Sequence, residues 1–400
     1  MKIGIVTAYD ECEANSEYSK ALKEEFERQG HSVEILRLPF SIFMDASRSM
    51  QARADTLIDE MAKKIPELDY VNIQYEGILF GCNCVKIKER VLKIIHACKS
   101  SSFSLTCHSR VNFDSRKIKQ NKLSQFIYKI RKKDRKLVQK NIDRMQYRIL
   151  EAVQDKNGLI IAHTIRDKNR ILSALPKANV KAFPLSYKRA DDIFALKQKF
   201  DKLSYQREKG LDLPDNTKKI GILGAFMYWK DFETAVKALC FLPENYHLFF
   251  YGGQHKLDFK GAPAGLPSIK NLQDLIAMKG LTNRVHFMGY QPTSEDMLNG
   301  HLFCDCIVLP YIEIGESGSG SASMALETCE NVFLARNHCF EELKNFCGEA
   351  VFNYDMGNYL ELAEKIQTMP DRQRILKQRE SYFSRYNVSE CVKMYLSIMK

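Results

Sequence analysis

The sequence predicts two doubly wound α/β domains, each a parallel sheet with helices on both faces. Its 400 residues exceed what one hydrophobic core normally organises, so two domains are the default expectation. Short apolar runs alternate with helical segments along most of the chain, which is the pattern of βα units and parallel sheets. The alternation breaks once, in a polar stretch that carries Gly210 and Pro214, and then restarts.

The strands are expected at the short apolar runs. In the first half they are Lys2–Thr7, Ser32–Leu36, Tyr70–Tyr75, Phe103–Cys107, Leu159–His163 and Val180–Leu185. In the second half they are Ile220–Leu223, His247–Tyr251, Val285–Met288, Cys306–Tyr311, Val332–Ala335 and Ala350–Phe352. Helical patterns fill the gaps, such as Ser16–Gln29, which Gly30 ends.

The interruption of this pattern sets the expected domain limits. We expect an N-terminal domain at 1–205, a linker at 206–219, a second domain at 220–384 and a terminal helix at 385–400. Ligands of doubly wound sheets bind at the carboxyl ends of the strands. With two such domains facing each other, the cleft between them is the expected place for a reaction of two substrates.

Composition excludes several classes of protein. No run of about 18 apolar residues is present, and Met1 and Lys2 lead directly into a strand, so the sequence predicts a cytoplasmic protein. The twelve cysteines do not fit the disulfide scaffold of a small secreted chain. Neither Cys-x-Cys pair, at 82/84 or 304/306, has a second pair at zinc-site spacing, so buried reduced thiols are expected.

The net charge of +11 is concentrated in one segment, 116–140. This segment has eleven Lys and Arg residues against one acid, with apolar residues near helical spacing. A basic amphipathic helix of this kind can lie on an anionic membrane face or meet an anionic acceptor. A solvated helix face is the alternative. Nucleic acid is a third option. No nucleic-acid-binding motif accompanies the segment, so nucleic acid is not expected as a partner.

The sharpest local feature is a turn rich in Gly and Ser at Gly315–Ser321, which follows one expected strand and precedes a helix. Glycines let a backbone approach a ligand closely, and free N–H groups at a helix start attract phosphate. The turn lacks the Gly-Lys-Ser/Thr ending of a Walker loop, and it is not Gly-x-Gly-x-x-Gly. The sequence therefore predicts a phosphate-binding turn, with a flexible connection as the alternative.

Polar residues also stand at the strand ends of the first half. Gln74 and Glu76 end one strand, whereas His108 and His163 follow two others. Such positions can contact a ligand, although a lone histidine is more often structural.

The second half resembles the retaining glycosyltransferases of the GT-B fold, of the family GT4 type. The matching segments occur in the family's order and cover most of residues 218–400. They are Ile220–Gly224 followed by Lys230, Phe249–Gly253, Arg284–Tyr290, the Gly/Ser turn with its helix, Val332–Arg336 and the final helix Tyr386–Met399. The resemblance implies two Rossmann-like domains.

The chain departs from the family at its Glu-x7-Glu pattern. Aligning on Glu327 puts Ser319 at the first acidic position, and aligning on the following strand puts Ser317 and Ala325 at the two positions. The turn is closer to a subgroup that has a Ser-Gly-Ser-Gly sequence there. Serines and backbone amides, rather than two carboxylates, are then expected to hold the donor.

The resemblance implies residue roles. Catalytic roles are expected for His108, Lys230 and Glu316. The donor is expected to contact Gly224, Lys230, Gly252, Gly253, Tyr311, Gly318, Ser319, Gly320, Ser321 and Glu327. The acceptor side is expected to include Asn15, Gln74, Glu76 and His163. Lys230 as a surface lysine and Glu327 as an exposed helix carboxylate are the alternatives.

The resemblance also implies the reaction. A sugar would pass, with retention, from a nucleotide diphosphate sugar to a glycan or lipid-linked acceptor, as in bacterial surface polysaccharide synthesis. No cofactor and no obligatory metal are expected, because no acidic pair is placed to hold one. The alternatives are a degenerate GT-B protein that binds a nucleotide or partner without turnover, and a nucleotide-sugar epimerase.

Overall fold

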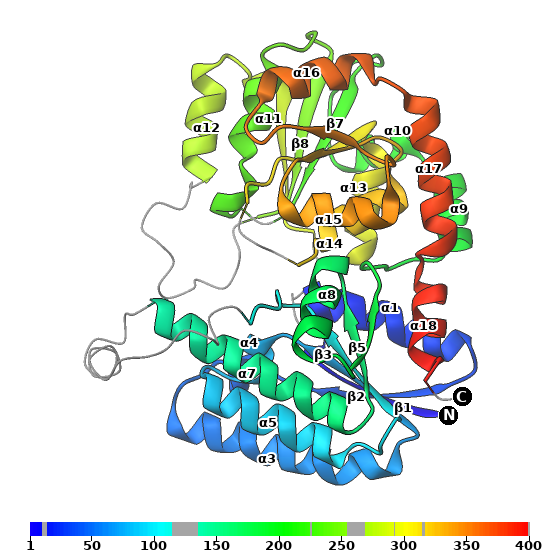
Figure 1. Ribbon diagram of the computed structural model, residues 1–400. Helices are drawn as coiled ribbons and strands as arrows, with labels where there is room; N and C mark the ends of the chain where they lie inside the picture. Colours follow the sequence, from blue (N-terminus) through cyan, green and yellow to red (C-terminus); the bar gives the residue numbers. More distant parts are fainter. Residues whose placement is uncertain are drawn as a thin grey trace. The chain divides into compact units, whose positions relative to one another are not determined.

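The structure is a computed structural model that describes residues 1–9, 14–113, 135–224, 226–253, 269–291, 293–313 and 317–398. The chain forms two compact units (Figure 1). Unit 1 contains Met1–Leu185 and Val388–Lys400, and unit 2 contains Ser186–Asn387. The chain thus passes into unit 2 before the linker predicted at 206–219, and its last helix returns to unit 1.

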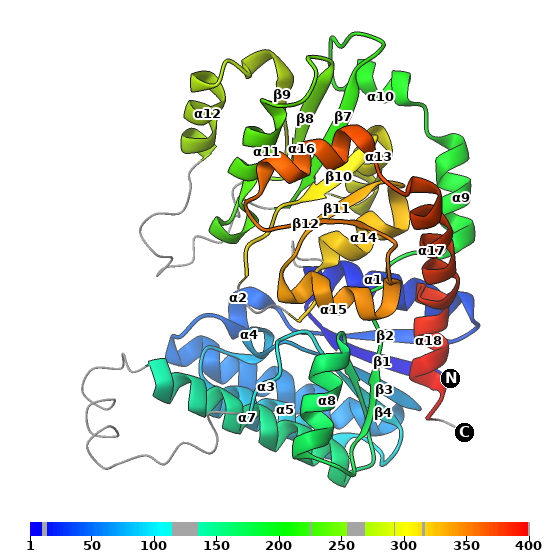
Figure 2. The ribbon, with the colours of Figure 1, turned by 45° about the horizontal axis from the view of Figure 1, so that its top comes forward.

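Unit 1 is built on a six-stranded parallel sheet with the strand order β2-β1-β3-β4-β5-β6. Its strands are β1 Lys2–Thr7, β2 Ser32–Arg37, β3 Tyr70–Tyr75, β4 Phe103–Cys107, β5 Leu159–Ala162 and β6 Asn179–Ala182. Its helices are α1 Ala14–Arg28, α2 Phe40–Phe43, α3 Arg48–Lys64, η1 Ile65–Glu67, α4 Gly77–Phe80, α5 Cys84–Ala97, α7 Arg135–Asp155, α8 Ile165–Ala174 and α18 Val388–Leu396. Helices α1 and α18 pack on one face, and α3, α5 and α7 pack on the other (Figures 1 and 2).

Unit 2 has a second six-stranded parallel sheet, with the order β12-β11-β10-β7-β8-β9. Its strands are β7 Lys218–Leu223, β8 Tyr246–Tyr251, β9 Val285–Gly289, β10 Cys306–Leu309, β11 Val332–Ala335 and β12 Phe352–Tyr354. Its helices are α9 Ala190–Lys199, α10 Lys202–Glu208, η3 Tyr228–Lys230, α11 Phe232–Leu239, α12 Ile269–Met278, η4 Thr282–Arg284, α13 Ser294–Phe303, α14 Gly320–Thr328, α15 His338–Cys347, α16 Tyr359–Thr368 and α17 Arg372–Arg385. Helices α11, α12 and α16 cover one face of the sheet with an apolar core.

The predicted fold class is confirmed, because every predicted strand coincides with or overlaps an observed one. Three predicted strands were too long. The one at Leu159–His163 ends one residue earlier, and those at Cys306–Tyr311 and Val180–Leu185 end before Pro310 and Pro184. Proline has no N–H to donate to the sheet, which explains the last two ends. The strand predicted at Ala350–Phe352 lies two residues later, at β12 Phe352–Tyr354. There Tyr354 pairs with Ala335, the last residue of β11.

The predicted linker is not a single irregular segment. Its first residues belong to α10, and its last belong to β7. Tyr205 of α10 is buried, and its ring centroid lies 5.1 Å from that of Phe303. The polar composition of this stretch therefore concealed a helix that packs through one aromatic ring.

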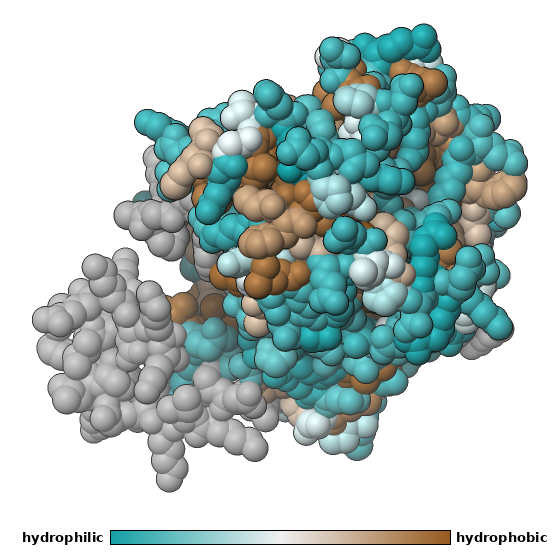
Figure 3. Space-filling model, turned by 90° about the horizontal axis from the view of Figure 1, so that it is seen from above, coloured by the Kyte–Doolittle hydropathy of each residue, from teal (hydrophilic) through white to brown (hydrophobic). Residues whose placement is uncertain are grey.

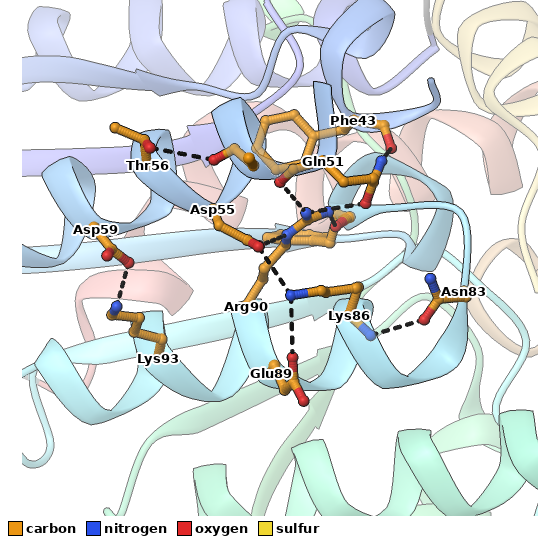
Figure 4. Close-up of polar contacts among 12 residues, drawn as sticks. Phe43, Gln51, Asp55, Thr56, Asp59, Asn83, Lys86, Glu89, Arg90 and Lys93 are labelled. Carbon is orange, nitrogen blue, oxygen red and sulfur yellow. Dashed lines mark hydrogen bonds and ion pairs between the residues drawn. The ribbon is translucent and has the colours of Figure 1, made fainter. Parts of the chain in front are cut away.

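A buried arginine joins helices α3 and α5 of unit 1 (Figure 4). Arg90 is 2% exposed, and its Nε donates to Asp55 over 2.8 Å. Its other nitrogens donate to the carbonyls of Phe80 and Gln51, and Lys86 donates to the second oxygen of Asp55. Because every donor group is used by the fold, this cluster is structural.

Apolar side chains lie in separate groups among predominantly hydrophilic ones on the face seen in Figure 3. Exposed large apolar residues of unit 2 include Phe241, Met278 and Leu360. Among the described residues, no helix is both long enough and apolar enough to cross a membrane. The predicted basic segment 116–140 falls largely outside the described residues, so the membrane prediction for it remains a prediction.

Candidate functional site

The carboxyl edge of the unit 2 sheet contains its switch point, which is the place between β7 and β10 where the strand order reverses. Gly224 follows β7 there with a φ of +116°, a conformation that residues with a Cβ rarely adopt. A Cβ on Gly224 would lie 3.4 Å from Cε of Lys230 and 3.5 Å from Oη of Tyr311. The structure thus brings together three of the predicted donor residues.

Lys230 ends the turn η3 and lies over the ring of Tyr311. Its Nζ is 3.5 Å from the ring centroid, a cation–π contact. Tyr311 is 2% exposed, and its hydroxyl donates to the carbonyl of Leu223 over 3.2 Å. No carboxylate in the described part of the chain forms an ion pair with Lys230. A positive charge is therefore held at the switch point, with no acidic partner in the part of the chain that the structure describes.

The segment after β10 is fixed by three hydrogen bonds from neighbouring elements. The N–H of Ile312 donates to the carbonyl of Trp229 over 2.8 Å. Nδ2 of Asn337 donates to the carbonyl of Tyr311 over 3.1 Å, and the N–H of His338 donates to the Glu313 carboxylate over 2.6 Å. The entry to the Gly/Ser turn is therefore held in place, partly by Asn337, which the sequence analysis missed.

The Gly/Ser turn leads into helix α14. Ser319 caps this helix, because its Oγ accepts from the N–H of Ala322 over 3.3 Å. Within the described residues, the N–H groups of Gly320 and Ser321 have no hydrogen-bond partner. Gly318 through Ser321 are partly exposed, as an anion site at this helix start requires. Gly315 and Glu316, two residues of the prediction, lie outside the described residues.

Tyr187, which precedes α9, also contacts this helix start. Its Oη would lie 2.7 Å from a Cβ on Gly320, so a larger residue at this position would require the tyrosine hydroxyl to shift. The backbone N–H of Tyr187 donates to Oε1 of Glu327 over 2.7 Å. Nothing in the sequence links Tyr187 to a turn so far along the chain, and the sequence analysis missed it.

Glu327 is buried, not an exposed helix carboxylate. It stands in the last turn of α14 and is 3% exposed. Burial raises its pKa to about 8, against the opposing effect of the N–H groups of Tyr187 and Lys188. The Glu327 carboxyl is therefore hydrogen-bonded inside unit 2. The predicted contact of Glu327 with the donor remains a prediction.

Replacing Glu327 by Gln is expected to remove a pH-dependent loss of stability. The folded-state pKa of Glu327 is raised above its unfolded value, so the unfolded state gives up the proton first as pH rises. The stability of the native protein should fall relative to Glu327→Gln by about 1.4 kcal/mol per pH unit between pH ~4.5 and ~8. Urea unfolding of both proteins across this range measures the difference, and parallel curves would contradict the burial of this carboxyl.

Gly252 and Gly253 follow β8 and line the same edge of the sheet. The N–H of Gly252 donates to the carbonyl of Gly289 over 2.9 Å. The carbonyl of Gly253 accepts from Phe226 over 3.1 Å, and a Cβ on Gly253 would lie 3.5 Å from Cβ of Tyr290. Both glycines are thus tied to neighbouring loops at the predicted donor edge.

In unit 1 the predicted histidines meet at the carboxyl ends of β4 and β5. Nε2 of His163 lies 3.3 Å from Nδ1 of His108, and Nε2 of His108 lies 2.5 Å from Oε1 of Gln74. Nδ1 of His163 lies 3.0 Å from the carbonyl of Phe183. The ring of Tyr18 packs edge-on against both imidazoles. Both ring nitrogens of His108 are thus engaged with side chains of the protein.

The protons of this network can be assigned from its acceptors. The carbonyl of Phe183 only accepts, so Nδ1 of His163 donates, and in a neutral ring its Nε2 is a lone pair. Nδ1 of His108 must then donate to it, which leaves Nε2 of His108 as an acceptor facing Gln74. If Oε1 of Gln74 faces that nitrogen, two acceptors meet, and the contact is a hydrogen bond only when Nε2 of His108 carries an extra proton. If the amide is turned over, its NH2 group donates to Nε2 and the histidine pair stays neutral. Nε2 of Gln74 donates to Oδ1 of Asn72, so turning the Gln74 amide over requires the Asn72 amide to turn as well. The proton count of the histidine pair is thus coupled to the orientation of these two amides.

Burial keeps the histidine pair neutral near pH 7. It lowers the pKa of His163 to about 4 and holds the pKa of His108 well below its usual range, where the charge of His163 also disfavours protonation. Gln74 and His163 are buried beneath the partly exposed His108. The positions of Gln74 and His163 suit a role in orienting His108 better than a direct contact with the acceptor.

Replacing His163 by Asn is expected to flatten the acid side of the stability curve. The folded-state pKa of His163 is below the unfolded value of ~6.5, so native stability is lost as pH falls from ~6.5 to ~4. Asn can still donate to the carbonyl of Phe183 but cannot bind a proton. Between pH ~6.5 and ~4, the free energy of unfolding of His163→Asn should therefore fall by about 3 kcal/mol less than that of the native protein. Urea unfolding at each pH measures the difference.

Asn15 and Glu76, both predicted on the acceptor side, contact each other, and Nδ2 of Asn15 donates to the Glu76 carboxylate. Burial raises the pKa of Glu76, and this hydrogen bond opposes the rise. The pair therefore adds a polar group at the carboxyl end of β3. Among the described residues, no group of three or more His, Cys, Asp or Glu side chains is arranged to hold a metal ion.

Comparisons with known proteins identify the fold. No protein-family model and no curated protein matches the sequence. Anabaena Alr3699/HepE, solved with UDP, is 16% identical with a TM-score of 0.64, over 99% of this chain and 100% of that chain. A glycosyltransferase from Rickettsia africae ESF-5 is 14% identical with a TM-score of 0.63, over 100% and 99%.

A third solved structure is the UDP-forming α,α-trehalose-phosphate synthase from Burkholderia xenovorans, in complex with glucose-6-phosphate. It is 10% identical with a TM-score of 0.64, over 100% of both chains. At such low identities the likeness shows the fold alone. The two six-stranded α/β units are those of the GT-B fold, as the sequence predicted.

Proposed function

We propose that this protein is a glycosyltransferase that uses a nucleotide diphosphate sugar as its donor. The observation that carries the proposal is the ammonium of Lys230, held against Tyr311 at the switch point of unit 2 without an acidic partner among the described residues. A nucleotide diphosphate is an anion whose charge grows as it leaves the sugar. Fixed cations and N–H donors aimed at such a developing charge accelerate the reaction.

The donor diphosphate would be held by two groups of unit 2. Its oxygens would accept from Lys230 and from the N–H groups of Gly320 and Ser321 at the start of α14, with the hydroxyls of Ser319 and Ser321 nearby. Gly224 would let the backbone approach the phosphates closely. Alr3699/HepE has been solved with UDP and with UDP-glucose, which supports a uridine diphosphate sugar as the donor class.

The proposed reaction proceeds with retention, as in the GT4-type enzymes that the second half resembles. The bond between the anomeric carbon and the β-phosphate oxygen breaks, and the acceptor oxygen bonds to that carbon on the same face. The acceptor proton passes to the departing phosphate, so the protein needs no nucleophile of its own. Lys230 would stabilise the charge left on the diphosphate.

The acceptor side is assigned to unit 1. His108 would face the sugar or acceptor, held in one orientation by Gln74 and His163, while Asn15 and Glu76 would offer hydrogen bonds to hydroxyl groups. A glycan or a lipid-linked acceptor, as in surface polysaccharide synthesis, fits the basic segment 116–140. Binding of the purified protein to anionic liposomes at low salt tests the membrane part of this assignment.

A panel of UDP-, GDP- and ADP-sugars tests the proposed function. Each donor is incubated with the protein, with and without candidate acceptors, while free nucleotide and labelled sugar products are measured. Acceptor-dependent nucleotide release supports transfer, and the anomeric configuration of the product tests retention. Donor binding without release would instead support the degenerate protein, and an epimerised donor the epimerase. No donor binding at all would overturn the proposal.

A further inference from the structure

Unit 2 has a pocket at the amino-terminal edge of its sheet, opposite the candidate donor site. It has a volume of about 350 Å³ and lies beside Asp305 and Asn331, which precede β10 and β11. Helices α9 and α17, which run side by side in Figures 1 and 2, contribute Lys197 and Arg372. A pocket of this size can hold a small molecule. It is separate from the candidate donor site, which lies at the carboxyl edge.

The floor of the pocket contains a buried acceptor without a partner. Nδ1 of His301 lies 2.6 Å from Oγ1 of Thr328, which itself donates to the carbonyl of Met324 over 2.7 Å. Nδ1 must therefore donate, and Nε2 of a neutral ring is a lone pair. His301 is 1% exposed, and this Nε2 has no hydrogen-bond partner among the described residues. Burial lowers the pKa of His301 to about 3, so the ring stays neutral.

The rim of the pocket is positively charged. Lys202 pairs with Asp305 over 3.1 Å, and Arg372 pairs with Glu330 over 2.6 Å. Lys197, an exposed residue of α9, forms no ion pair among the described residues. Partial desolvation and then the charge of Arg379 lower its pKa, and the charge of Glu330 opposes the shift. The cations that line the pocket therefore outnumber the carboxylates, which favours an anion.

The thiols of the pocket do not favour a metal ion. Burial raises the pKa of Cys304 and of Cys329. In the described part of the chain, no group of three or more His, Cys, Asp or Glu side chains is placed to hold a metal ion. Sγ of Cys329 donates to the carbonyl of Asn331 over 3.5 Å. The pocket therefore offers one neutral acceptor, His301, below an excess of positive charge.

We propose that this pocket binds a small oxyanion that also carries a hydroxyl hydrogen, with hydrogen phosphate as the simplest member. Its anionic oxygens accept from Lys197, and its hydroxyl donates to Nε2 of His301. An unpaired buried acceptor rejects an anion that cannot donate to it, because both groups then remain unsatisfied. The pocket therefore discriminates hydrogen phosphate from sulfate, which has the same shape but no proton at pH 7.5. A phosphate ester with a nearby hydroxyl belongs to the same class.

Isothermal titration of the full chain with phosphate and with sulfate, at pH 7.5 and equal ionic strength, tests the proposal. The native protein should bind phosphate and show no comparable binding of sulfate. Lys197→Met should weaken phosphate binding about tenfold, the worth of one charge-assisted hydrogen bond. Lys199→Met, which removes an exposed charge of the same helix outside the pocket, is the matched control and should bind as the native protein does.

A histidine variant tests the acceptor separately. His301→Leu removes both ring nitrogens and leaves no side-chain acceptor at this position, so it should abolish the preference for phosphate over sulfate. Thermal unfolding without ligand shows whether each variant is folded. Equal binding of both anions by the native protein would overturn the proposal. Phosphate binding lost in Lys230→Met and kept in Lys197→Met would also overturn it, because the anion would then occupy the carboxyl edge.

Discussion

Replacing Lys230 by Met is expected to lower the rate of sugar transfer by about 10²–10³-fold, the usual cost of removing one donor that faces developing charge. Affinity for UDP should fall by about tenfold as well, because the diphosphate loses a charged partner in the ground state. The reason is positional: Nζ lies 3.5 Å from the Tyr311 ring centroid, beside Gly224. Steady-state kinetics and UDP titration measure the two effects separately.

The matched control for this prediction is Lys237→Met. Lys237 lies on α11, one helix beyond η3, and forms an exposed ion pair with Glu233 over 3.1 Å. Removing an exposed pair of this kind normally changes stability by less than about 1 kcal/mol. Its kinetics should therefore remain those of the native protein. Transfer by Lys230→Met at the native rate would contradict the role of Lys230, even if UDP binding were weaker.

Tyr311 separates the two ways in which Lys230 can be held. Tyr311→Phe keeps the ring under the ammonium and loses only the hydrogen bond to Leu223. Tyr311→Leu loses the ring as well. If the cation–π contact places Lys230, the leucine variant should show the larger loss of rate, so the order of the two variants reports which contact matters.

The parallel sheets were predictable because their inner strands, such as β3, β4, β10 and β11, are apolar runs buried on both faces. Tyr70–Tyr75 and Phe103–Cys107, for example, are buried throughout and were predicted with their observed limits. In such strands, composition alone marks the element. Prolines explain two errors of length, since a predicted run continued past a residue that cannot donate to the sheet.

The unit boundary was not predictable from composition. The chain enters unit 2 at Ser186, inside the loop between β6 and α9, where no Gly- or Ser-rich stretch marks a linker. The polar stretch that does look like a linker starts inside α10, whose Tyr205 is buried against Phe303. A single aromatic anchor decides that packing, and local polarity does not reveal it.

The site was predictable where strand ends determine it, and not where distant segments meet. Gly224 and Tyr311 stand at the ends of neighbouring strands, so the topology brings them together. The contacts of Tyr187 with Gly320 and Glu327 join residues far apart in the chain. Such contacts depend on how helices pack, and no spacing in the sequence encodes them.

Replacing Gly224 by Ala is expected to weaken UDP binding by tenfold or more, about 1.4 kcal/mol. A residue with a Cβ is strained at a φ of +116°, at a cost of about 1–3 kcal/mol in stability. The added Cβ would also meet Cε of Lys230 and Oη of Tyr311, both close to normal contact distance. Relaxing the strain requires the backbone to move, and that movement displaces the ammonium from the switch point.

Gly210→Ala is the control that separates strain from site geometry. Gly210 also has a positive φ, of +63°, but nothing lies within 4 Å of its Cβ position. Its substitution should cost a comparable, somewhat smaller amount of stability, about 1 kcal/mol, and leave UDP binding unchanged. Urea unfolding and UDP titration of both variants give the comparison.

If both variants lost UDP affinity in proportion to their stability, general destabilisation would explain the effect and Gly224 would have no specific role. If only Gly224→Ala lost affinity, the close approach of Lys230 and Tyr311 to this glycine would be a requirement of donor binding, independent of the stability of the sheet.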